Sequence, residues 1–129
     1  MENLLEKESV KRVNDFIKKF DSSLEIITLD KSARTAKDAA TALNCAVGAI
    51  VKSLVLKADN GFLICLVAGD KRCSLNKLKK LIEKKDVCMA DAEQVKLQTG
   101  FSIGGVAPVA HSNKLEVLID NSLRRFKDV

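Results

Sequence analysis

The chain has 129 residues, of which 47% are hydrophobic and 30% charged, and its formal net charge is +5. This composition is typical of a folded domain and does not indicate disorder. The longest apolar run, FLICLVA over residues 62–68, is far shorter than the roughly 20 residues that span a bilayer. The first residues mix acids and bases, unlike a secretory signal, so we expect one cytoplasmic domain over residues 1–129.

Metal chemistry finds little support in the sequence. The four cysteines are widely spaced, no C-x-x-C pair occurs, and His111 is the only histidine. A zinc site needs four well-placed ligands. We therefore expect no metal, and we interpret Cys45 and Cys65, which lie in apolar runs, as small core residues.

Hydrophobic periodicity divides the chain into helices and strands. Apolar residues at helical spacing predict helices, and short β-rich runs predict strands. In chain order, the expected elements are a helix over 2–20, a strand over 24–29, a helix after a capping-box pair at Thr35 and Asp38, strands over 49–58 and 61–69, a helix after Ser74, a strand over 86–90, a helix from Asp91 to Gly100, a strand over 114–120 and a short final segment over 121–126.

The expected strands combine into a single sheet. The runs over 49–58 and 61–69 are separated by Asp59 and Asn60, which is a strong hairpin signal because such residues tolerate tight turns. No repeat, linker or low-complexity tract divides the chain. The sequence therefore predicts an α+β fold around a mostly antiparallel sheet.

Basic residues gather in one part of the chain. Between residues 71 and 85 a single acid, Glu83, stands among Lys71, Arg72, Lys77, Lys79, Lys80, Lys84 and Lys85. In the helix expected there, Lys77, Lys80 and Lys84 align outside, and the residues that face inward are Leu75, Leu78, Leu81 and Ile82. A smaller cluster holds Arg124, Arg125 and Lys127. Such clusters neutralise phosphates or simply form a solvated surface, and the pattern alone favours the solvated surface.

Lys52 is the first candidate for chemistry. On a strand it shares a face with Ile50, Leu54 and Leu56. A lysine among such side chains either extends its ammonium to water at a sheet edge or is held over a cleft as a fixed cation. A fixed cation suits a phosphate or a polarised carbonyl. Periodicity leaves both alternatives open.

The stretch FSIGGVAPVAH over residues 101–111 is the second candidate. It contains Gly104, Gly105, His111 and the only proline of the chain, Pro108. The glycines let the main chain bend and let another molecule approach it, and the proline then restricts the backbone. Such a loop either binds a small polar group through its backbone or is a bend between a helix and a strand. Spacing alone favours the bend.

The remaining polar candidates carry weaker signals. No serine or cysteine is paired to His111 by a recognisable motif, so a catalytic triad has no support. Asp70 and Asp120 each follow a strand, where functional carboxylates often lie. Turn-forming and capping roles account for both residues equally well.

Three segments together resemble the YbaK-type aminoacyl-tRNA deacylase domain, which also occurs as the editing insertion of bacterial prolyl-tRNA synthetases. They read AIVKSLVLKADNGFLICLVAGDKRCSLNKLKKL, ADAEQVKLQTGFSIGGVAPVAH and LEVLIDNSLRRF. The resemblance runs from about Ala33 to the last residue. Its most specific part is the combination of the IVKSL strand with the GGVxPVxH loop.

The resemblance implies a curved, mostly antiparallel or mixed sheet, or a barrel, with helices packed outside. It also implies hydrolysis, in trans, of the ester that joins a wrong amino acid to a tRNA, with proline tRNA as one candidate. In such domains a water or a ribose hydroxyl attacks the ester, and neither a metal nor another cofactor is needed. The implied partners are the 3′ end of an aminoacyl-tRNA and, as a second candidate, an aminoacyl-tRNA synthetase; no membrane is involved.

The resemblance also assigns site residues. Lys52 stands where the family has its functional lysine, and it would hold a phosphate or stabilise the developing oxyanion. Gly104 and Pro108 stand at the ends of the family's G-x-x-x-P loop, whose carbonyls would accept hydrogen bonds from the substrate ammonium. Both roles require Lys52 and the loop to border one hollow. The predicted groups are Lys52, Gly104, Gly105 and Pro108 as catalytic, His111, Asp120, Ser53 and Ile50 as substrate-binding, and Lys71, Arg72, Lys77, Lys80 and Lys84 as nucleic-acid-binding.

Some features depart from the family pattern. Relatives usually have glycine where Ala110 stands, and a polar residue or proline where Ala107 stands. The resemblance further implies that the chain stops at RFKDV, before a strand and a final helix that relatives usually carry. Two alternative functions therefore stay open: a non-catalytic module that binds tRNA or a synthetase, and a hydrolase of another acyl or phosphoryl substrate.

Overall fold

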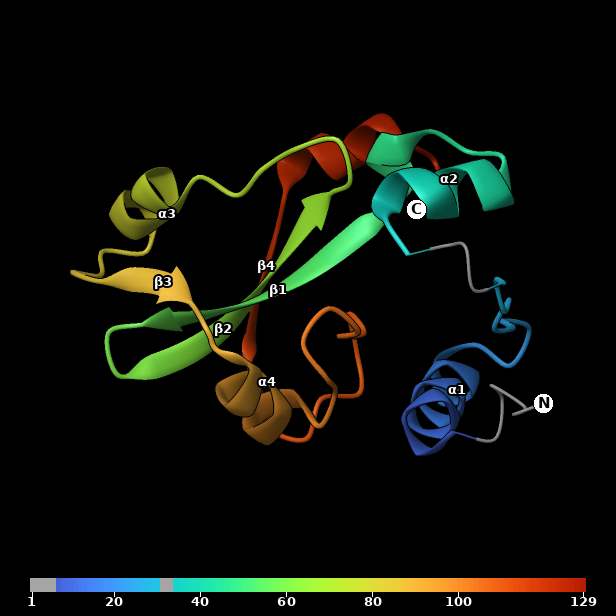
Figure 1. Ribbon diagram of the computed structural model, residues 1–129, viewed down its shortest axis with the longest axis horizontal. Coiled ribbons are helices and arrows are strands. Elements are labelled where there is room, and N and C mark those ends of the chain that lie inside the picture. Colours follow the sequence, from blue (N-terminus) through green and yellow to red (C-terminus); the bar gives the residue numbers. More distant parts are fainter. Residues whose placement is uncertain (1–6, 31–33) are drawn as a thin grey trace.

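A long β-hairpin lies at the centre of the structure. The computed structural model describes residues 7–30 and 34–129. Its elements are α1 (Glu8–Phe20), α2 (Ala36–Leu43), β1 (Val51–Ala58), β2 (Gly61–Ala68), α3 (Leu75–Leu81), β3 (Val87–Met89), α4 (Ala92–Thr99) and β4 (Glu116–Ile119), with short 3₁₀ turns η2 (Val47–Ala49) and η3 (Asn121–Arg125) (Figure 1).

The four strands form one open, mixed sheet in the order β3-β1-β2-β4. β1 pairs antiparallel with both β2 and β3, whereas β4 runs parallel to β2. The parallel pair is possible because the chain between β2 and β4 contains α3, β3 and α4, which is long enough for a crossover. The α+β prediction with a mostly antiparallel, mixed sheet is confirmed.

The hairpin turn also connects to β3. Ala58 pairs with Gly61, so Asp59 and Asn60 form a two-residue turn, as predicted. Asp59 itself takes the left-handed backbone conformation, with φ of 51°. Its carboxylate accepts hydrogen bonds from the backbone N–H groups of Lys85, at 3.2 Å, and Asp86, at 2.9 Å. The turn therefore fixes the segment that leads into β3.

Each face of the sheet carries its own hydrophobic cluster, because successive strand residues point to opposite faces. On one face, Leu56 is fully buried and packs with Leu78 of α3. On the other face, Ile64 is fully buried and packs with Val95 of α4. Burying one such aliphatic side chain contributes about 1.5–3 kcal/mol. We call the two sides the α3 face and the α4 face.

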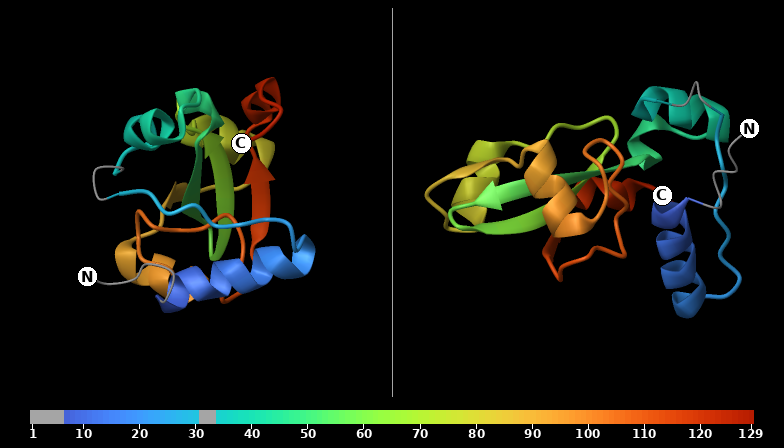
Figure 2. Two further views of the ribbon diagram at one scale, coloured as in Figure 1. Left: turned by 90° about the vertical axis from the view of Figure 1, so that its right-hand side faces the viewer. Right: turned by 60° about the horizontal axis from the view of Figure 1, so that its bottom comes forward.

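Helix α1 contributes no buried residue. It is held to the rest of the molecule through Arg12, whose Nη2 donates to the Thr99 carbonyl at 2.8 Å and whose guanidinium lies 4.4 Å from the centre of the Phe101 ring. Figure 2 shows α1 beside the loop that follows α4, away from the sheet. No helix among residues 7–30 and 34–129 is long and apolar enough to cross a membrane.

Several predicted elements need correction. Residues 24–29 form no strand, because no other strand lies beside them to accept their hydrogen bonds, and Ile27 is largely exposed. Leu81 is 77% exposed rather than inward-facing, since α3 ends at that residue. The first helix begins at Glu8, and the part predicted over 2–6 lies outside the described residues. The other helices and strands are confirmed, with β4 shorter than expected.

A glycine substitution tests how tightly η2 packs on the end of β2. A Cβ atom on Gly69 would overlap the carbonyl oxygen of Val47 and lie 3.0 Å from that of Ile50. Backbone atoms cannot move aside cheaply, so we expect Gly69→Ala to lower the free energy of unfolding by about 2 kcal/mol. Gly61→Ala is the matched control, because the nearest atom to its Cβ is 3.8 Å away. Urea denaturation that finds equal losses for the two variants contradicts this packing.

Candidate functional site

The loop over residues 101–111 is anchored at both ends to the last turn of α4. Thr99 is fully buried, and its hydroxyl donates to the Val95 carbonyl at 2.7 Å while accepting from the Phe101 N–H at 3.0 Å. The Ser112 N–H donates to the Thr99 carbonyl at 3.0 Å. Because the two ends of the loop meet on one residue, the loop has a defined position although its middle is exposed.

Two residues of the loop take left-handed backbone conformations. Gly104 has φ of 81°, and a Cβ atom placed there would have no neighbour within 4 Å. Glycine at this position therefore allows the left-handed backbone conformation, and its lack of a side chain leaves the main chain open to an approaching molecule. Ala110 has φ of 65°, a conformation that disfavours residues with a Cβ atom. Relatives of the YbaK-type domain usually have glycine at this position, as noted in the sequence analysis.

His111 braces the loop from within. Its Nε2 lies 2.7 Å from the Ala107 carbonyl, so Nε2 carries the proton and donates it to that oxygen. The imidazole also meets the Phe101 ring edge to face, with the ring centres 6.1 Å apart. These contacts hold the segment on which Pro108 lies. A direct contact between His111 and the substrate, as predicted, would have to use Nδ1. Otherwise His111 would contribute by stabilising the loop through these contacts.

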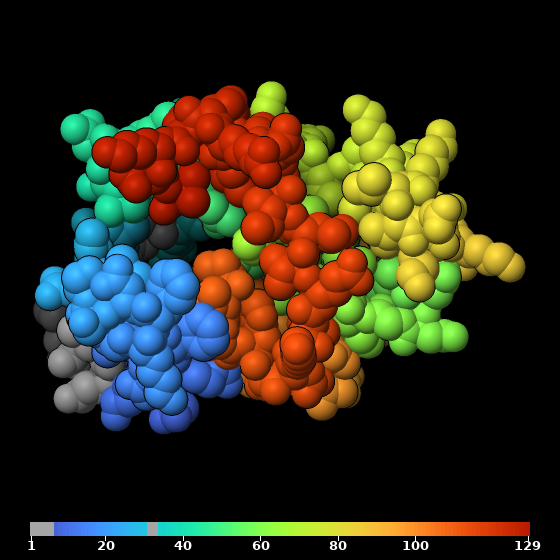
Figure 3. All heavy atoms as spheres, turned by 180° about the vertical axis from the view of Figure 1, so that it is seen from behind, coloured from blue at the N-terminus to red at the C-terminus, as the bar shows by residue number. Residues whose placement is uncertain are grey.

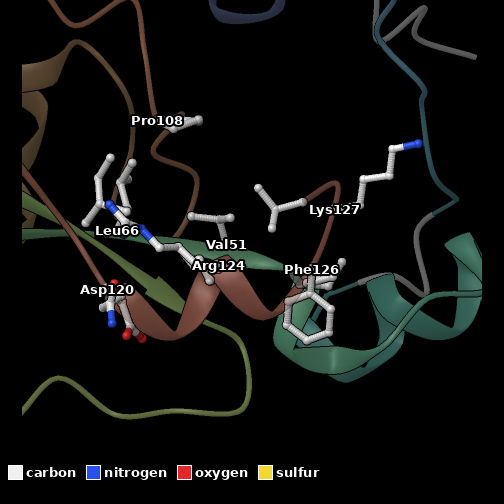
Figure 4. Close-up of a pocket in the computed structure, with 13 residues that line it drawn as sticks. Val51, Leu66, Pro108, Asp120, Arg124, Phe126 and Lys127 are labelled. Atoms are coloured by element: carbon white, nitrogen blue, oxygen red, sulfur yellow. The ribbon is translucent and has the colours of Figure 1, made fainter.

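A cavity of about 680 Å³ lies on the α4 face, beneath Pro108. We call it the loop cavity. Its wall on the sheet side is apolar and includes Val51 of β1 and Leu66 of β2. Figure 3 shows the surface hollowed between the loop and the C-terminal residues, and Figure 4 shows Pro108 facing Arg124 and Phe126 across the cavity. The cavity is thus an apolar space with charged side chains at its rim, and Pro108, rather than Gly104 or Gly105, is the loop residue that lines it.

Asp120 lies at the end of β4, where it caps η3. Its carboxylate accepts from the backbone N–H of Ser122 at 2.9 Å and from that of Ala68 at 3.2 Å. Burial raises the pKa of Asp120, but the hydrogen bonds from Ser122 and Ala68, together with the charge of Arg125, outweigh it and leave the pKa below its ordinary value. Asp120 is therefore an anion that lines the loop cavity.

Lys52 does not border the loop cavity with Pro108. Lys52 pairs with Val67 on the α3 face, and its Nζ donates to the Lys71 carbonyl at 2.6 Å. Its neighbour Val51 points to the opposite face and lines the loop cavity. The prediction that the ammonium and the loop share one hollow is wrong, because strand alternation puts them on different faces. Both nevertheless lie near the end of the sheet where β1 begins.

The other predicted site residues divide between the two faces. Ile50, which precedes β1, lines the loop cavity, and Ser53 lies on the α4 face opposite Leu66. A second cavity of about 540 Å³, the α3 cavity, lies between α3 and β4. Among its lining residues are Lys71, Arg72, Lys77 and Asp120. Lys80 on α3 and Lys84, which lies three residues after the helix ends, are instead exposed and line a shallow outer hollow. Asp120 lines both cavities, so the two hollows adjoin at the end of β4.

The sequence matches the profile of the aminoacyl-tRNA editing domain over residues 30–129. The chain belongs to this family. It is 34% identical over 105 residues to the proline–tRNA ligase of Thermosipho africanus, covering 78% of this chain and 18% of the ligase. It is also 30% identical over 122 residues to the uncharacterized protein YwhH of Bacillus subtilis, covering 94% of this chain and 77% of that protein. The chain thus spans less than a fifth of the ligases it matches.

Solved structures of similar proteins share the fold of this editing domain. One, described as a candidate trans-editing enzyme for prolyl-tRNA synthetase, has a TM-score of 0.87 and 37% identity, covering 93% of this chain and 76% of its own. Another, described as a hypothetical protein, has a TM-score of 0.80 and 32% identity, covering 90% and 77%. The predicted resemblance to the YbaK-type domain is confirmed.

The sequence interpretation of the editing domain left two cations out of the site. Arg124 and Lys127 line the loop cavity, whereas Arg125 between them pairs with Asp70, with Nη2 and Oδ1 2.8 Å apart. That pair holds the pKa of Asp70 below its ordinary value. The cluster was visible in the sequence, but its spacing did not indicate which members face a cavity. The geometry of η3 separates them.

The strained backbone at Ala110 gives a prediction for the loop. Replacing Ala110 by glycine removes the Cβ atom that disfavours a φ of 65°, and this relief exceeds the entropy that glycine adds to the unfolded chain. We expect Ala110→Gly to raise the free energy of unfolding by about 1 kcal/mol. Ala107→Gly is the control, because no positive φ occurs there, and it should destabilise. Thermal unfolding of both variants checks the difference in sign.

The depressed pKa of Asp120 predicts a pH dependence. A carboxyl whose pKa is lower in the folded chain stabilises the fold above its unfolded pKa, near the ordinary value of 3.8, and loses this contribution as pH falls through the folded pKa. We expect the free energy of unfolding to fall less steeply below about pH 4 in Asp120→Asn than in the wild type. Urea denaturation at a series of pH values measures both slopes. Equal slopes contradict the prediction.

Proposed function

We propose that the chain is a deacylase that acts in trans on mischarged tRNA, in the cytoplasm, with residues 1–129 working as one editing domain. Family membership supports the substrate class, since the family is described as an aminoacyl-tRNA editing domain. The observation that carries the proposal is the loop cavity, which combines an apolar wall, Pro108 of the loop and cationic side chains in one hollow. Matches to proline–tRNA ligases favour proline tRNA as the carrier.

The loop cavity suits the aminoacyl end of the substrate. An amino-acid side chain would lie against Val51 and Leu66, and the α-ammonium would meet the loop at Pro108, whose main-chain carbonyl would accept its hydrogen bond. Gly104 and Gly105 do not line this cavity, and Gly105 instead lines a separate hollow with Val10 and Val13 of α1, so their role would be to shape the loop that carries Pro108. The loop would therefore contact the charged ammonium that every aminoacyl ester carries through the segment at Pro108.

Hydrolysis needs a nucleophile and a stabilised oxyanion. Water attacks the ester carbonyl carbon, the carbonyl oxygen becomes negatively charged, and the bond to the ribose oxygen breaks as that oxygen takes a proton. Positive charge near the developing oxyanion lowers the barrier. Lys52 is the second residue of β1 and carries a flexible side chain, so we assign it to this role, or to the terminal phosphate, at the end of the sheet. Arg124 is the competing cation.

The basic residues on and before α3 would contact the rest of the tRNA. Lys71, Arg72 and Lys77 gather at the α3 cavity, and Lys80 and Lys84 extend the positive surface along α3. Such a surface attracts a phosphate backbone without reading its sequence. Ser53, His111 and Asp120 remain proposed substrate contacts, with Asp120 placed where the two cavities adjoin.

Binding without hydrolysis is the second candidate function. The observation that favours it is the position of Lys52, whose ammonium donates to the Lys71 carbonyl on the face opposite Pro108. If that position persists with substrate bound, Lys52 does not act on the ester. Such a module would bind tRNA or a synthetase and leave the ester intact. A gel shift with a constant level of acylation over time identifies this outcome.

A screen of mischarged tRNAs tests the deacylase. The wild type should hydrolyse at least one mischarged proline tRNA, measured by the loss of radiolabelled amino acid from acid-precipitated tRNA. We expect Lys52→Ala to lower the rate on the order of 10²-fold, because one group that stabilises an oxyanion contributes about that much. Lys57→Ala, at the other end of the same strand, is the matched control and should retain full activity.

The same assay separates the two cations. If Arg124→Ala abolishes hydrolysis while Lys52→Ala does not, the charge comes from η3 and the assignment of Lys52 is wrong. Circular dichroism spectra and melting temperatures close to those of the wild type establish that each variant is folded. No hydrolysis by the wild type across the panel contradicts the deacylase proposal itself.

A further inference from the structure

A second groove lies next to the loop cavity. It occupies about 760 Å³ between α1 and the segment from Pro108 to Lys114, and we call it the α1 groove. Pro108 lines both hollows, so they adjoin at that residue. Figure 3 shows the blue α1 and the orange loop bordering the same hollowed part of the surface. A ligand whose end lies in the loop cavity can therefore continue into the α1 groove.

The α1 groove combines an aromatic ring with positive charge. Phe16 lines it and is 46% exposed, so one part of its ring is accessible. Lys19 from α1 and Lys114 from the loop contribute cations, and Asp15 is the acidic lining residue. Around the groove, α1 and the residue before it are basic overall, with Lys7, Lys11, Arg12, Lys18 and Lys19 against Glu8 and Asp15.

These features match the chemistry of single-stranded nucleic acid. Proteins bind such strands by stacking bases on aromatic side chains and by following the backbone with lysine and arginine. A duplex offers no free base face to Phe16, whereas an unpaired 3′ end does. The basic residues on and before α3 are a poorer match for this role, because the residues that line the α3 cavity include no aromatic ring.

The attachment of α1 gives the groove its shape. Arg12 joins α1 to Thr99 and Phe101, the residues that also anchor the loop. These contacts help to set the position of Phe16 relative to Pro108, although α1 contributes no buried residue to the core. A strand of nucleotides bound there would contact α1 and the loop together.

We propose that the α1 groove binds the single-stranded 3′ end of the aminoacyl-tRNA, with a base stacked on Phe16 and phosphates on Lys19 and Lys114. This inference rests on the proposed function, since it takes the terminal aminoacyl group to lie in the loop cavity. It assigns the unpaired nucleotides to α1 and leaves the base-paired body of the tRNA to the α3 surface.

Fluorescence anisotropy with a labelled RNA oligonucleotide ending in CCA tests the groove. We expect Phe16→Ala to weaken binding about tenfold, and Phe16→Trp to restore it, because stacking needs a ring. Phe20→Ala is the matched control on the same helix, since Phe20 is 81% exposed and lies outside the groove. The same oligonucleotide annealed to its complement should lose the preference for Phe16.

The charges of the groove have a separate readout. Each phosphate contact on a single strand contributes about 0.7 to the slope of log K against log salt concentration. We expect the double variant Lys19→Gln, Lys114→Gln to reduce that slope by about 1.4. Lys37→Gln, an exposed lysine on α2, should leave the slope unchanged. Equal effects of Lys37→Gln and the groove variants overturn the proposal.

The outcomes distinguish this inference from the function on which it rests. If the wild type hydrolyses a mischarged tRNA, but Phe16→Ala changes neither KM nor binding of the oligonucleotide, the α1 groove is not the site and the deacylase stands. If the oligonucleotide binds through Phe16 but no mischarged tRNA is hydrolysed, the deacylase is wrong and the groove stands. Melting temperatures close to that of the wild type show that each variant is folded.

Discussion

Thr99 is the residue through which the loop, α4 and α1 are held together. Its hydroxyl accepts from Phe101 at the start of the loop, and its carbonyl accepts both from Ser112 at the end of the loop and from Arg12 of α1. The side chain is fully buried, so these hydrogen bonds form away from water, where an unsatisfied polar group is costly. The shapes of the loop cavity and of the α1 groove both depend on this one anchoring point.

The sheet separates the charges of the molecule into two sets. Strand alternation directs Lys52 toward α3 and Val51 toward the loop, although the two residues are adjacent. The loop cavity and the α3 cavity adjoin where β4 ends, at Ile119, Asp120 and Asn121. A substrate that uses both Lys52 and the loop must therefore bind around the end of the sheet. A substrate that binds across one face would use only one of the two sets.

Local signals predicted most of the elements because the interactions behind them are local. The capping boxes at Thr35 and Asp91 involve residues three positions apart, and the two-residue hairpin turn needs only the chain that folds back on itself. The stretch over 24–29 looked like a strand by composition, but a strand requires a neighbour, and no strand among residues 7–30 and 34–129 pairs with it. Leu81 was expected to face inward, but it is exposed because the helix ends at that residue.

The amino-acid sequence was sufficient for the α+β class, the order of elements, the glycine loop and the family, because each depends on residue types at short and regular spacings. It was not sufficient for the site. Whether Lys52 and Pro108 share a hollow depends on strand pairing and on the side of the sheet to which the loop returns after α4. Likewise, the choice of Arg124 rather than Arg125 as a cavity residue follows from the ion pair with Asp70, which lies 55 positions away in the chain. Contacts between distant segments decide such questions, and no local pattern encodes them.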